Sequence, residues 1–151
     1  MTQHQKREYA FLLLYEAIMR GDTPDTLEEL FTDTEQLPEL EKILPEVKQT
    51  VSQALAQKDI LDEIIAKYSE KRTLNRIAVV NRTILLLALF ELRNTPKEVA
   101  AENILIYEAV RLSKAYAYPE DTAFINGVLG NYVRDHAASK EDSAHEFDPG
   151  D

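Results

Sequence analysis

Histidines and paired acids are the side chains of this sequence that could move protons near neutral pH, as catalysis requires. The three histidines are His4, His136 and His145, and all of them lie near an end of the chain. A catalytic group needs a rigid frame and a partner that orients it, which chain ends rarely supply. The adjacent acids Glu28 and Glu29 have no partner base or pocket and are typical of a solvated helix face. We therefore expect no catalytic residue among them.

Catalytic and cofactor-binding motifs are missing from the sequence. It contains no glycine-rich phosphate loop, no HExxH pair and no GxSxG turn. The absence of cysteine excludes a disulfide, a thiolate metal site and a thiol nucleophile, and it fits a reducing cytosol. The acids near the C-terminus do not have the spacing of a calcium loop. The sequence therefore predicts a binding protein that is not an enzyme and uses no cofactor or metal.

Basic side chains beside aromatic rings are the features that could bind a macromolecule. Lys6 and Arg7 stand close to Tyr9 and Tyr15, and residues 71–82 contain four basic side chains and no acid. Cations neutralise nucleic-acid phosphates, and aromatic rings stack on unpaired bases. Both segments are therefore candidate RNA-binding surfaces, and the alternative for each is an ordinary basic helix end.

The net charge of −10, from 17 basic and 27 acidic residues, is unusual for a protein that binds phosphates. Residues 28–41 contain six acids and no base, and residues 137–151 contain five acids and one lysine, a net charge of −4. The latter segment is also poor in large apolar groups, so its burial cannot offset the entropy of ordering it. We predict a disordered acidic tail over residues 137–151, following a helical domain of residues 1–136.

Apolar residues recur with helical spacing along the chain, which predicts an all-α fold. The predicted helices cover residues 3–20, 24–31, 38–44, 45–68, 77–92, 97–116 and 119–136. We expect Gly21 to end the first helix as a left-handed C-cap and residues 32–36 to form a polar loop. Lys58 interrupts the apolar stripe of residues 45–68. Residues 77–92 are apolar nearly all round, so this helix should be the central one. Its apolar run, residues 84–90, is too short to span a membrane, and the N-terminus lacks the apolar core of a signal peptide. We therefore expect a cytoplasmic protein without membrane contact.

Four passages, taken in order, are similar to those of a known family. They are residues 7–15 (REYAFLLLY), 84–92 (ILLLALFEL), 106–114 (IYEAVRLSK) and 124–129 (FINGVL). At these spacings they resemble the NusB family of bacterial transcription antitermination factors, over about residues 7–133. The resemblance implies a NusB-like fold of about seven helices in two packed helical subdomains.

The resemblance also implies a function in transcription regulation. Members of the family pair with the small-subunit ribosomal protein NusE, and the pair binds the single-stranded boxA element of nascent RNA. The complex helps RNA polymerase to pass terminators, notably in ribosomal RNA operons. The implied partners are thus boxA-type RNA, NusE and the RNA polymerase antitermination complex. The oligomeric state stays open, and a homodimer is one alternative.

Five RNA-binding candidates follow from the resemblance. They are Lys6, Arg7, Tyr15, Lys114 and Phe124. The N-terminus of the family is rich in arginine, and here only Arg7 matches it, with Lys6 as a basic neighbour. Gln3, His4 and Gln5 occupy positions that are often arginine. Because each lost phosphate contact removes affinity, we expect weaker binding to RNA alone than that of a typical member.

The partner-binding candidates implied by the resemblance are Asn81 and Arg82, at the usual Glu-Lys or Glu-Arg positions where the central helix of the family starts. Asn81 has no charge there, Leu86 replaces a common arginine, and Tyr107 replaces a common asparagine. For Phe124, a place in the core is an equal alternative to RNA contact. The alternative function is a protein–protein adaptor that keeps the NusB fold and has lost strong RNA binding.

Overall fold

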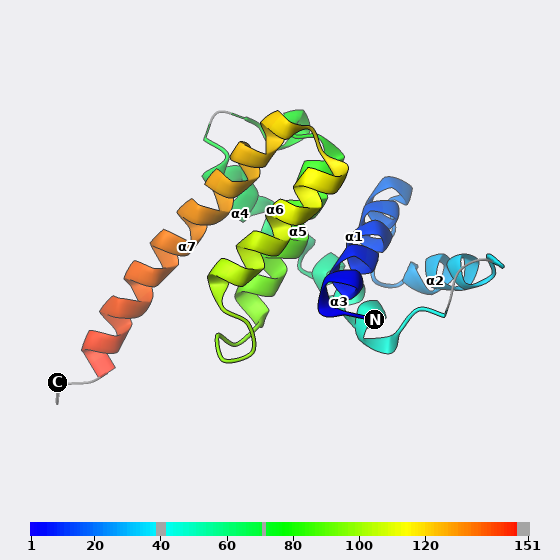
Figure 1. Cartoon of the computed structure of the whole chain (residues 1–151), viewed down its shortest axis with the longest axis horizontal. Helices are drawn as coiled ribbons and strands as arrows, with labels where there is room; N and C mark the ends of the chain where they lie inside the picture. Colours follow the sequence, from blue (N-terminus) through cyan, green and yellow to red (C-terminus); the bar gives the residue numbers. More distant parts are fainter. Residues whose placement is uncertain (39–41, 71, 148–151) are drawn as a thin grey trace.

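The computed structural model describes residues 1–38, 42–70 and 72–147, with residues 137–147 described by their backbone alone. This part of the chain contains seven α-helices, one short 3-10 helix and no strand. They are α1 (Gln3–Arg20), α2 (Leu27–Glu35), α3 (Pro45–Ala56), α4 (Lys58–Tyr68), η1 (Leu74–Arg76), α5 (Val79–Asn94), α6 (Glu102–Tyr116) and α7 (Pro119–Phe147). The predicted all-α fold of about seven helices is confirmed (Figure 1).

Helix α5 is the centre of the fold, because it packs against α1, α3, α4, α6 and α7. All its residues from 83 to 90 are buried, as its apolar sequence predicts. Figure 1 shows α1, α2 and α3 grouped on one side of it and α4 and α7 on the other. Replacing a fully buried side chain such as Leu85 by alanine would cost about 2–5 kcal/mol of unfolding free energy. Among the described residues, no helix, α5 included, is long and apolar enough to cross a membrane.

Helix α1 is fixed at both ends by local hydrogen bonds. The backbone N–H of Gln5 donates to Thr2 Oγ1 at 3.1 Å, and the backbone N–H of Thr2 donates to Gln5 Oε1 at 2.8 Å, which forms a capping box. At the other end, Gly21 ends the helix with a left-handed φ of 75°, as predicted for a glycine C-cap. The first two turns of α1, which carry Lys6 and Arg7, are therefore held in a defined position.

Residues 45–68, predicted as one continuous helix, form two helices. Helix α3 ends at Ala56 and α4 begins at Lys58, and Gln57 between them has φ −96° and ψ 8°. Lys58 is the charged residue that interrupts the apolar stripe, and its Nζ lies 2.8 Å from Asp62 Oδ2. The single-helix prediction was wrong because this interruption separates two buried faces, one on each helix.

Other helix boundaries also differ from the predicted ones. Helix α2 extends to Glu35 and includes most of the predicted loop 32–36. Helix α6 begins at Glu102, and residues 97–100 before it form a turn and a bend. In the predicted helix 38–44, residues 42–44 are not helical, and residues 39–41 lie outside the described residues. Helix ends depend on caps and tertiary contacts that an apolar period does not encode.

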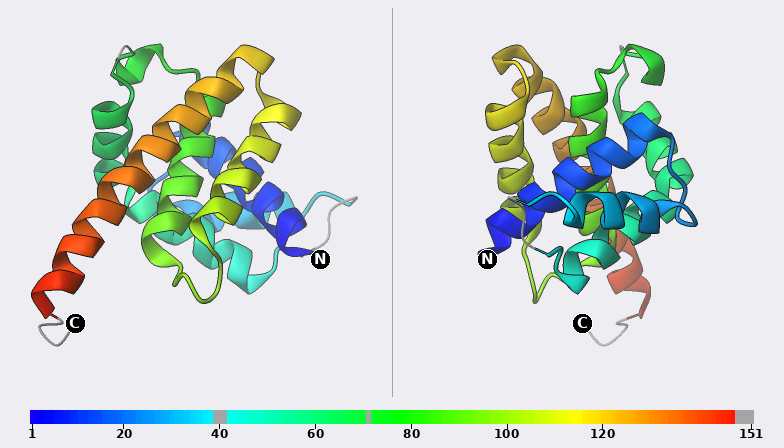
Figure 2. Two further views of the ribbon diagram at one scale, coloured as in Figure 1. Left: turned by 60° about the vertical axis from the view of Figure 1, so that its left-hand side comes forward. Right: turned by 90° about the vertical axis from the view of Figure 1, so that its right-hand side faces the viewer.

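Helix α7 continues through Phe147, so the backbone is helical over residues 137–147, where the sequence predicts disorder. In both views of Figure 2 this end of α7 extends beyond the other helices. Lengthening an existing helix avoids the cost of nucleation, and alanine, lysine and glutamate in this segment favour helix. Residues 148–151 of the predicted tail lie outside the described residues, and the division at residue 137 stays a prediction.

Candidate nucleic-acid interface

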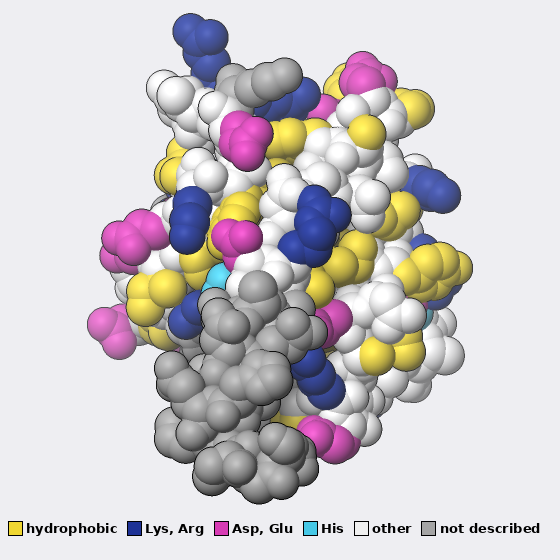
Figure 3. All heavy atoms as spheres, turned by 90° about the vertical axis from the view of Figure 1, so that its left-hand side faces the viewer, with side chains coloured by type: hydrophobic (Ala, Val, Ile, Leu, Met, Phe, Trp, Pro, Cys, Tyr) yellow, Lys and Arg dark blue, Asp and Glu magenta, His cyan; other side chains and the backbone are white. Residues whose placement is uncertain are grey.

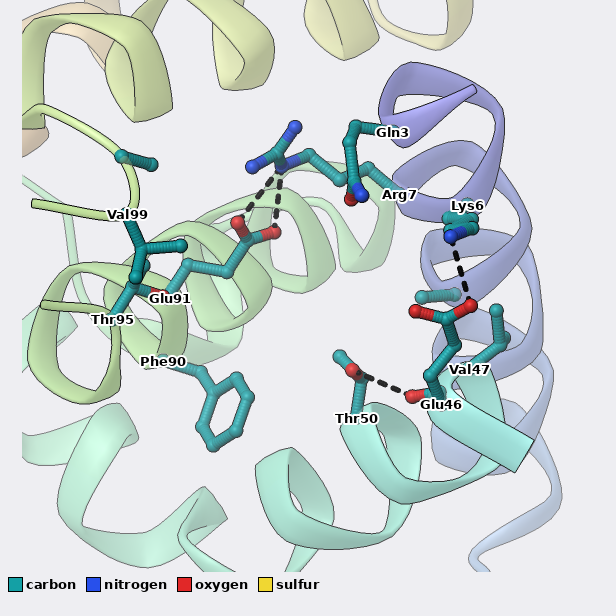
Figure 4. Close-up of a pocket in the computed structure, with 12 residues that line it drawn as sticks. Gln3, Lys6, Arg7, Glu46, Val47, Thr50, Phe90, Glu91, Thr95 and Val99 are labelled. Atoms are coloured by element: carbon teal, nitrogen blue, oxygen red, sulfur yellow. Dashed lines mark hydrogen bonds and ion pairs between the residues drawn. The ribbon is translucent and has the colours of Figure 1, made fainter. Parts of the chain in front are cut away.

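The two basic candidates of α1 both bind carboxylates of other helices. Arg7 Nε lies 2.8 Å from Glu91 Oε2 and 3.1 Å from Glu91 Oε1, which joins α1 to α5. Lys6 Nζ lies 2.8 Å from Glu46 Oε1, which joins α1 to α3. Figure 4 shows each cation and its glutamate pointing toward one another. Each of the two cations is therefore already paired with a carboxylate of this protein.

The Arg7–Glu91 pair is the more buried of the two, since its side chains are 18% and 14% exposed. Burial raises the pKa of Glu91, and the negative charge of Glu108 adds to this effect, while Arg7 lowers it. The net result is a pKa above the ordinary value of a glutamate. Removing one partner of such a pair leaves an uncompensated buried charge, which costs about 3–5 kcal/mol. Arg7 is therefore a structural residue, whatever else it binds.

These ion pairs form part of the wall of a pocket of about 340 Å³ between α1, α3 and the C-terminal end of α5. Phe90 and Val99 give the pocket an apolar part (Figure 4). An anionic ligand in this pocket would have to compete with the carboxylates of Glu46 and Glu91 for the two cations. The Lys6 pair is the easier one to open, because the side chain of Glu46 is 57% exposed.

The other RNA-binding candidates lie apart from this pocket. Tyr15 is half-buried on α1, with its ring centroid 6.4 Å from that of Phe11. Lys114 is exposed on α6. Phe124, near the start of α7, packs against the core and is only half-buried, and its contact with RNA stays a prediction. Lys6 and Arg7 line one pocket together, and the lining of that pocket does not include the other three.

Phe124 lines a second pocket, of about 280 Å³, between the C-terminal end of α4 and helix α7. The guanidinium of Arg72 lies 4.3 Å from the centroid of the Phe124 ring, and its Nη1 lies 3.6 Å from Asp121 Oδ1. Tyr68 also lines this pocket, and its hydroxyl donates to Asp135 Oδ2 at 2.6 Å. Burial and this hydrogen bond raise the pKa of Tyr68 to about 12. The Phe124 ring is therefore partly covered by a cation from the basic segment 71–82.

The partner-binding candidates lie at the start of α5. Asn81 is only 2% exposed, and its Oδ1 has no hydrogen-bond partner among the residues that the structure describes. Arg82 donates to both carboxylate oxygens of Asp62, at 3.0 Å from Nε and 2.7 Å from Nη2. Burial acts to raise the pKa of Asp62, but hydrogen bonds from Arg82 and Lys58 outweigh it and lower that pKa. The contact of these two residues with a partner protein stays a prediction.

Basic and acidic side chains are interspersed over one face of the molecule. Figure 3 shows Lys and Arg side chains scattered among acidic and apolar ones on the side of the molecule where α4 and α7 lie. On the helices of the other side, Arg20 of α1 lies 3.3 Å from Asp22 and Lys48 of α3 lies 3.1 Å from Glu35. RNA binding by this surface would therefore depend on individual side chains more than on a broad positive field.

Sequence reasoning did not identify Glu46, Glu91 and Asp62, the carboxylates that hold the basic candidates in place. A signal existed for Glu91, because it follows the apolar run 84–90 on the central helix, where a charge requires a partner. The sequence could not name that partner, because Arg7 is remote along the chain. Within the described residues, no three or more His, Cys, Asp or Glu side chains gather where they could hold a metal ion.

The fold is that of an all-helical protein with pockets lined in part by cations and aromatic rings. The model of the NusB family matches residues 4–134. The transcription antitermination protein NusB of Carboxydothermus hydrogenoformans is 36% identical over 139 residues, which cover 90% of this chain and 94% of that protein. The chain belongs to the NusB family, whose members are antitermination factors and not enzymes. The predicted family and the absence of enzymatic activity are both confirmed.

Solved structures agree with this assignment. The solution structure of NusB from Aquifex aeolicus has a TM-score of 0.68 at 26% identity, and the match covers 91% of this chain and 93% of that one. The crystal structure of the antitermination factors NusB and NusE in complex with dsRNA contains a similar chain, with a TM-score of 0.65 at 28% identity. That match covers 87% of this chain and 96% of the other. The NusB-like fold that the resemblance implied is confirmed.

Proposed function

We propose that this protein binds boxA RNA of nascent transcripts together with NusE, chiefly in ribosomal RNA operons, and so supports read-through by RNA polymerase. The observation that carries the proposal is its similarity, over 87% of its length, to a chain in a complex of NusB and NusE with dsRNA. This function requires access to nascent transcripts and to the RNA polymerase antitermination complex. The proposed location is therefore the cytoplasm.

The ion pairs at α1 shape the expected affinity. Lys6 and Arg7 reach an RNA phosphate only by leaving or sharing Glu46 and Glu91, 2.8 Å away in both cases. Lys114 is exposed on α6 and takes no part in these two ion pairs. We therefore expect weak binding of RNA by this protein alone and tighter binding with NusE, whose surface would supply further contacts.

The second candidate function is an adaptor that binds proteins and has lost strong RNA binding. Two observations favour it: the internal ion pairs of Lys6 and Arg7, and the net charge of −10. An adaptor of this kind would still bind NusE. The two functions therefore differ in RNA affinity and in its dependence on salt.

The experiment is a fluorescence anisotropy titration of a labelled boxA-type single-stranded RNA with the full chain. It is done with and without NusE, at two salt concentrations, with a scrambled RNA of equal length as the control. The proposed function predicts binding that NusE tightens, and a logarithmic salt slope of about −0.7 for each phosphate contact. If neither mixture binds RNA although the protein is helical by circular dichroism, the adaptor function replaces the proposed one.

A further inference from the structure

The outer face of α6 exposes large side chains that a helix usually buries. Tyr107 is 60% exposed and Ile104 is 49% exposed. Arg111 and Lys114 follow on the same face, because residues three and four apart are neighbours on a helix. The four side chains form one strip, which we call the α6 strip, and it contains two cations and no acid. Such a surface needs an explanation, since nothing in the fold requires an exposed tyrosine there.

The aromatic ring and the guanidinium of the strip lie close together. The Arg111 guanidinium carbon is 5.9 Å from the centroid of the Tyr107 ring. Arg111 is oriented by Glu108, whose Oε1 lies 3.3 Å from Arg111 Nη1. The side chain of Glu108 is only 12% exposed, so its charge lies beneath the strip rather than on it. The strip thus presents a π-face and a flanking cation to the solvent, the pair of groups that binds an unpaired base and its phosphate.

Glu108 also connects the strip to the N-terminus of α1. Its Oε2 lies 2.8 Å from His4 Nδ1, and His4 is followed on the same helix by Lys6 and Arg7. One carboxylate therefore holds His4 on one side and Arg111 on the other. The start of α1 and the α6 strip are therefore linked through a single side chain.

We propose that the α6 strip is a stacking site for an unpaired base of single-stranded RNA, with Tyr107 as the platform and Arg111 binding the adjacent phosphate. This inference rests on the proposed RNA-binding function and adds Tyr107 and Arg111 to the five candidates, of which Lys114 already lies on the strip. A protein partner fits the strip less well, because two exposed cations without an acid complement a polyanion. Lys114, at the end of the strip, would contact the next phosphate.

The size of the effect follows from the chemistry of stacking. A base stacked on one aromatic side chain gains about 1–3 kcal/mol, which equals a factor of roughly five to 150 in Kd. Tyrosine is neutral, so its loss would not change the number of counterions released. Arg111 differs, because it neutralises a phosphate and contributes about 0.7 to the salt slope. The two side chains can therefore be separated by experiment.

The test uses the full chain, the same labelled RNA and four variants. Tyr107→Ala should raise the Kd at least about fivefold with an unchanged salt slope, and Tyr107→Phe, which keeps the ring, should bind as the parent protein does. Arg111→Gln should lower the salt slope by about 0.7. The matched control is Ile60→Ala, which truncates an exposed apolar residue (51%) on α4 and should leave the Kd unchanged. Thermal melting by circular dichroism checks that every variant folds.

Three outcomes overturn the proposal, and they are distinguishable. If the parent protein binds RNA and Tyr107→Ala binds it equally well, the strip is not a stacking site, while the proposed function stands. If Tyr107→Ala weakens the association with NusE and leaves the RNA affinity of the chain alone unchanged, the strip binds protein. If the parent protein binds no RNA with or without NusE, the proposed function fails, and the inference fails with it.

Discussion

Two arginines of this protein each bind a glutamate, and their surroundings give them different roles. Arg7 and Glu91 join α1 to α5 with side chains only 18% and 14% exposed. Arg111 lies on the outside of α6 with a side chain 42% exposed, and its partner Glu108 is 12% exposed. The first arginine is needed to neutralise a buried carboxylate, whereas the second can turn toward a ligand while Glu108 keeps His4 as a partner. The arginine that matches the family's N-terminus is thus the less available of the two.

The largest effect expected from this comparison is on stability. Arg7→Ala should lower the free energy of unfolding by about 3–5 kcal/mol, because it leaves the buried Glu91 carboxylate without its cation. Urea unfolding followed by circular dichroism measures the change. The double variant Arg7→Ala with Glu91→Leu should recover part of the loss, because it removes the unpaired charge as well. A loss below about 1 kcal/mol in the single variant would show that the pair behaves like a surface pair.

The Arg7–Glu91 pair also predicts how the stability lost in Arg7→Ala depends on pH. The pKa of Glu91 is raised in the folded protein, so the folded state binds this proton more readily than the unfolded state. The contribution of Glu91 to the free energy of unfolding is therefore highest in acid, and it falls as the pH rises above the ordinary pKa range of glutamate. Removing Arg7 raises the pKa of Glu91 further, so the penalty of Arg7→Ala should be largest at neutral pH. A penalty that stays constant between pH 7 and pH 4 would contradict this account.

The exposed arginine should give a smaller effect on stability. Arg111→Ala should lower the free energy of unfolding by no more than about 1 kcal/mol, because a largely solvated ion pair contributes little. Its effect should instead appear in the salt slope of RNA binding, as argued for the α6 strip. The control is Arg93→Ala, which removes an exposed arginine of α5 and should change neither quantity. A loss of stability as large as that of Arg7→Ala would remove the difference between the two arginines.

Much of the fold could be predicted from the sequence, because burial leaves a periodic pattern. The apolar run 84–90 identifies α5 as central, and Gly21 marks the end of α1. The break at Gln57 was missed, because the apolar spacing resumes after Lys58 and so resembles the pattern of one continuous helix. For residues 137–147, composition indicates how little the segment can bury, but it does not encode the extension of a helix that already exists, and the backbone there is helical.

The candidate site was less predictable than the fold. The resemblance identified Lys6 and Arg7 by type and position, but an ion pair depends on which side chain of another helix lies opposite. Glu46 and Glu91 come from two different helices, and neither stands near α1 in sequence. The exposed Tyr107 was noted only as a departure from the family, because exposure cannot be deduced from a residue type that is often half-buried.

The smallest expected effect concerns the exposed pair of α1. Glu46→Gln should release Lys6 and tighten RNA binding by about fivefold or less, because a surface ion pair holds the lysine by only about 0–1 kcal/mol. The free lysine should also steepen the salt slope by up to about 0.7. Glu28→Gln is the matched control, because it removes the same charge from an exposed acid of α2.

If both variants tighten binding equally, the gain comes from the change in net charge and not from Lys6. If Glu46→Gln alone tightens it, the carboxylate of Glu46 competes with RNA phosphates for Lys6, 2.8 Å away.

The same titration with Arg7→Lys would separate the two basic candidates. Lysine keeps the charge but loses the contact that Arg7 Nε makes with both carboxylate oxygens of Glu91. A change in stability without a change in RNA affinity would confine Arg7 to its structural role. RNA contact at the start of α1 would then depend on Lys6.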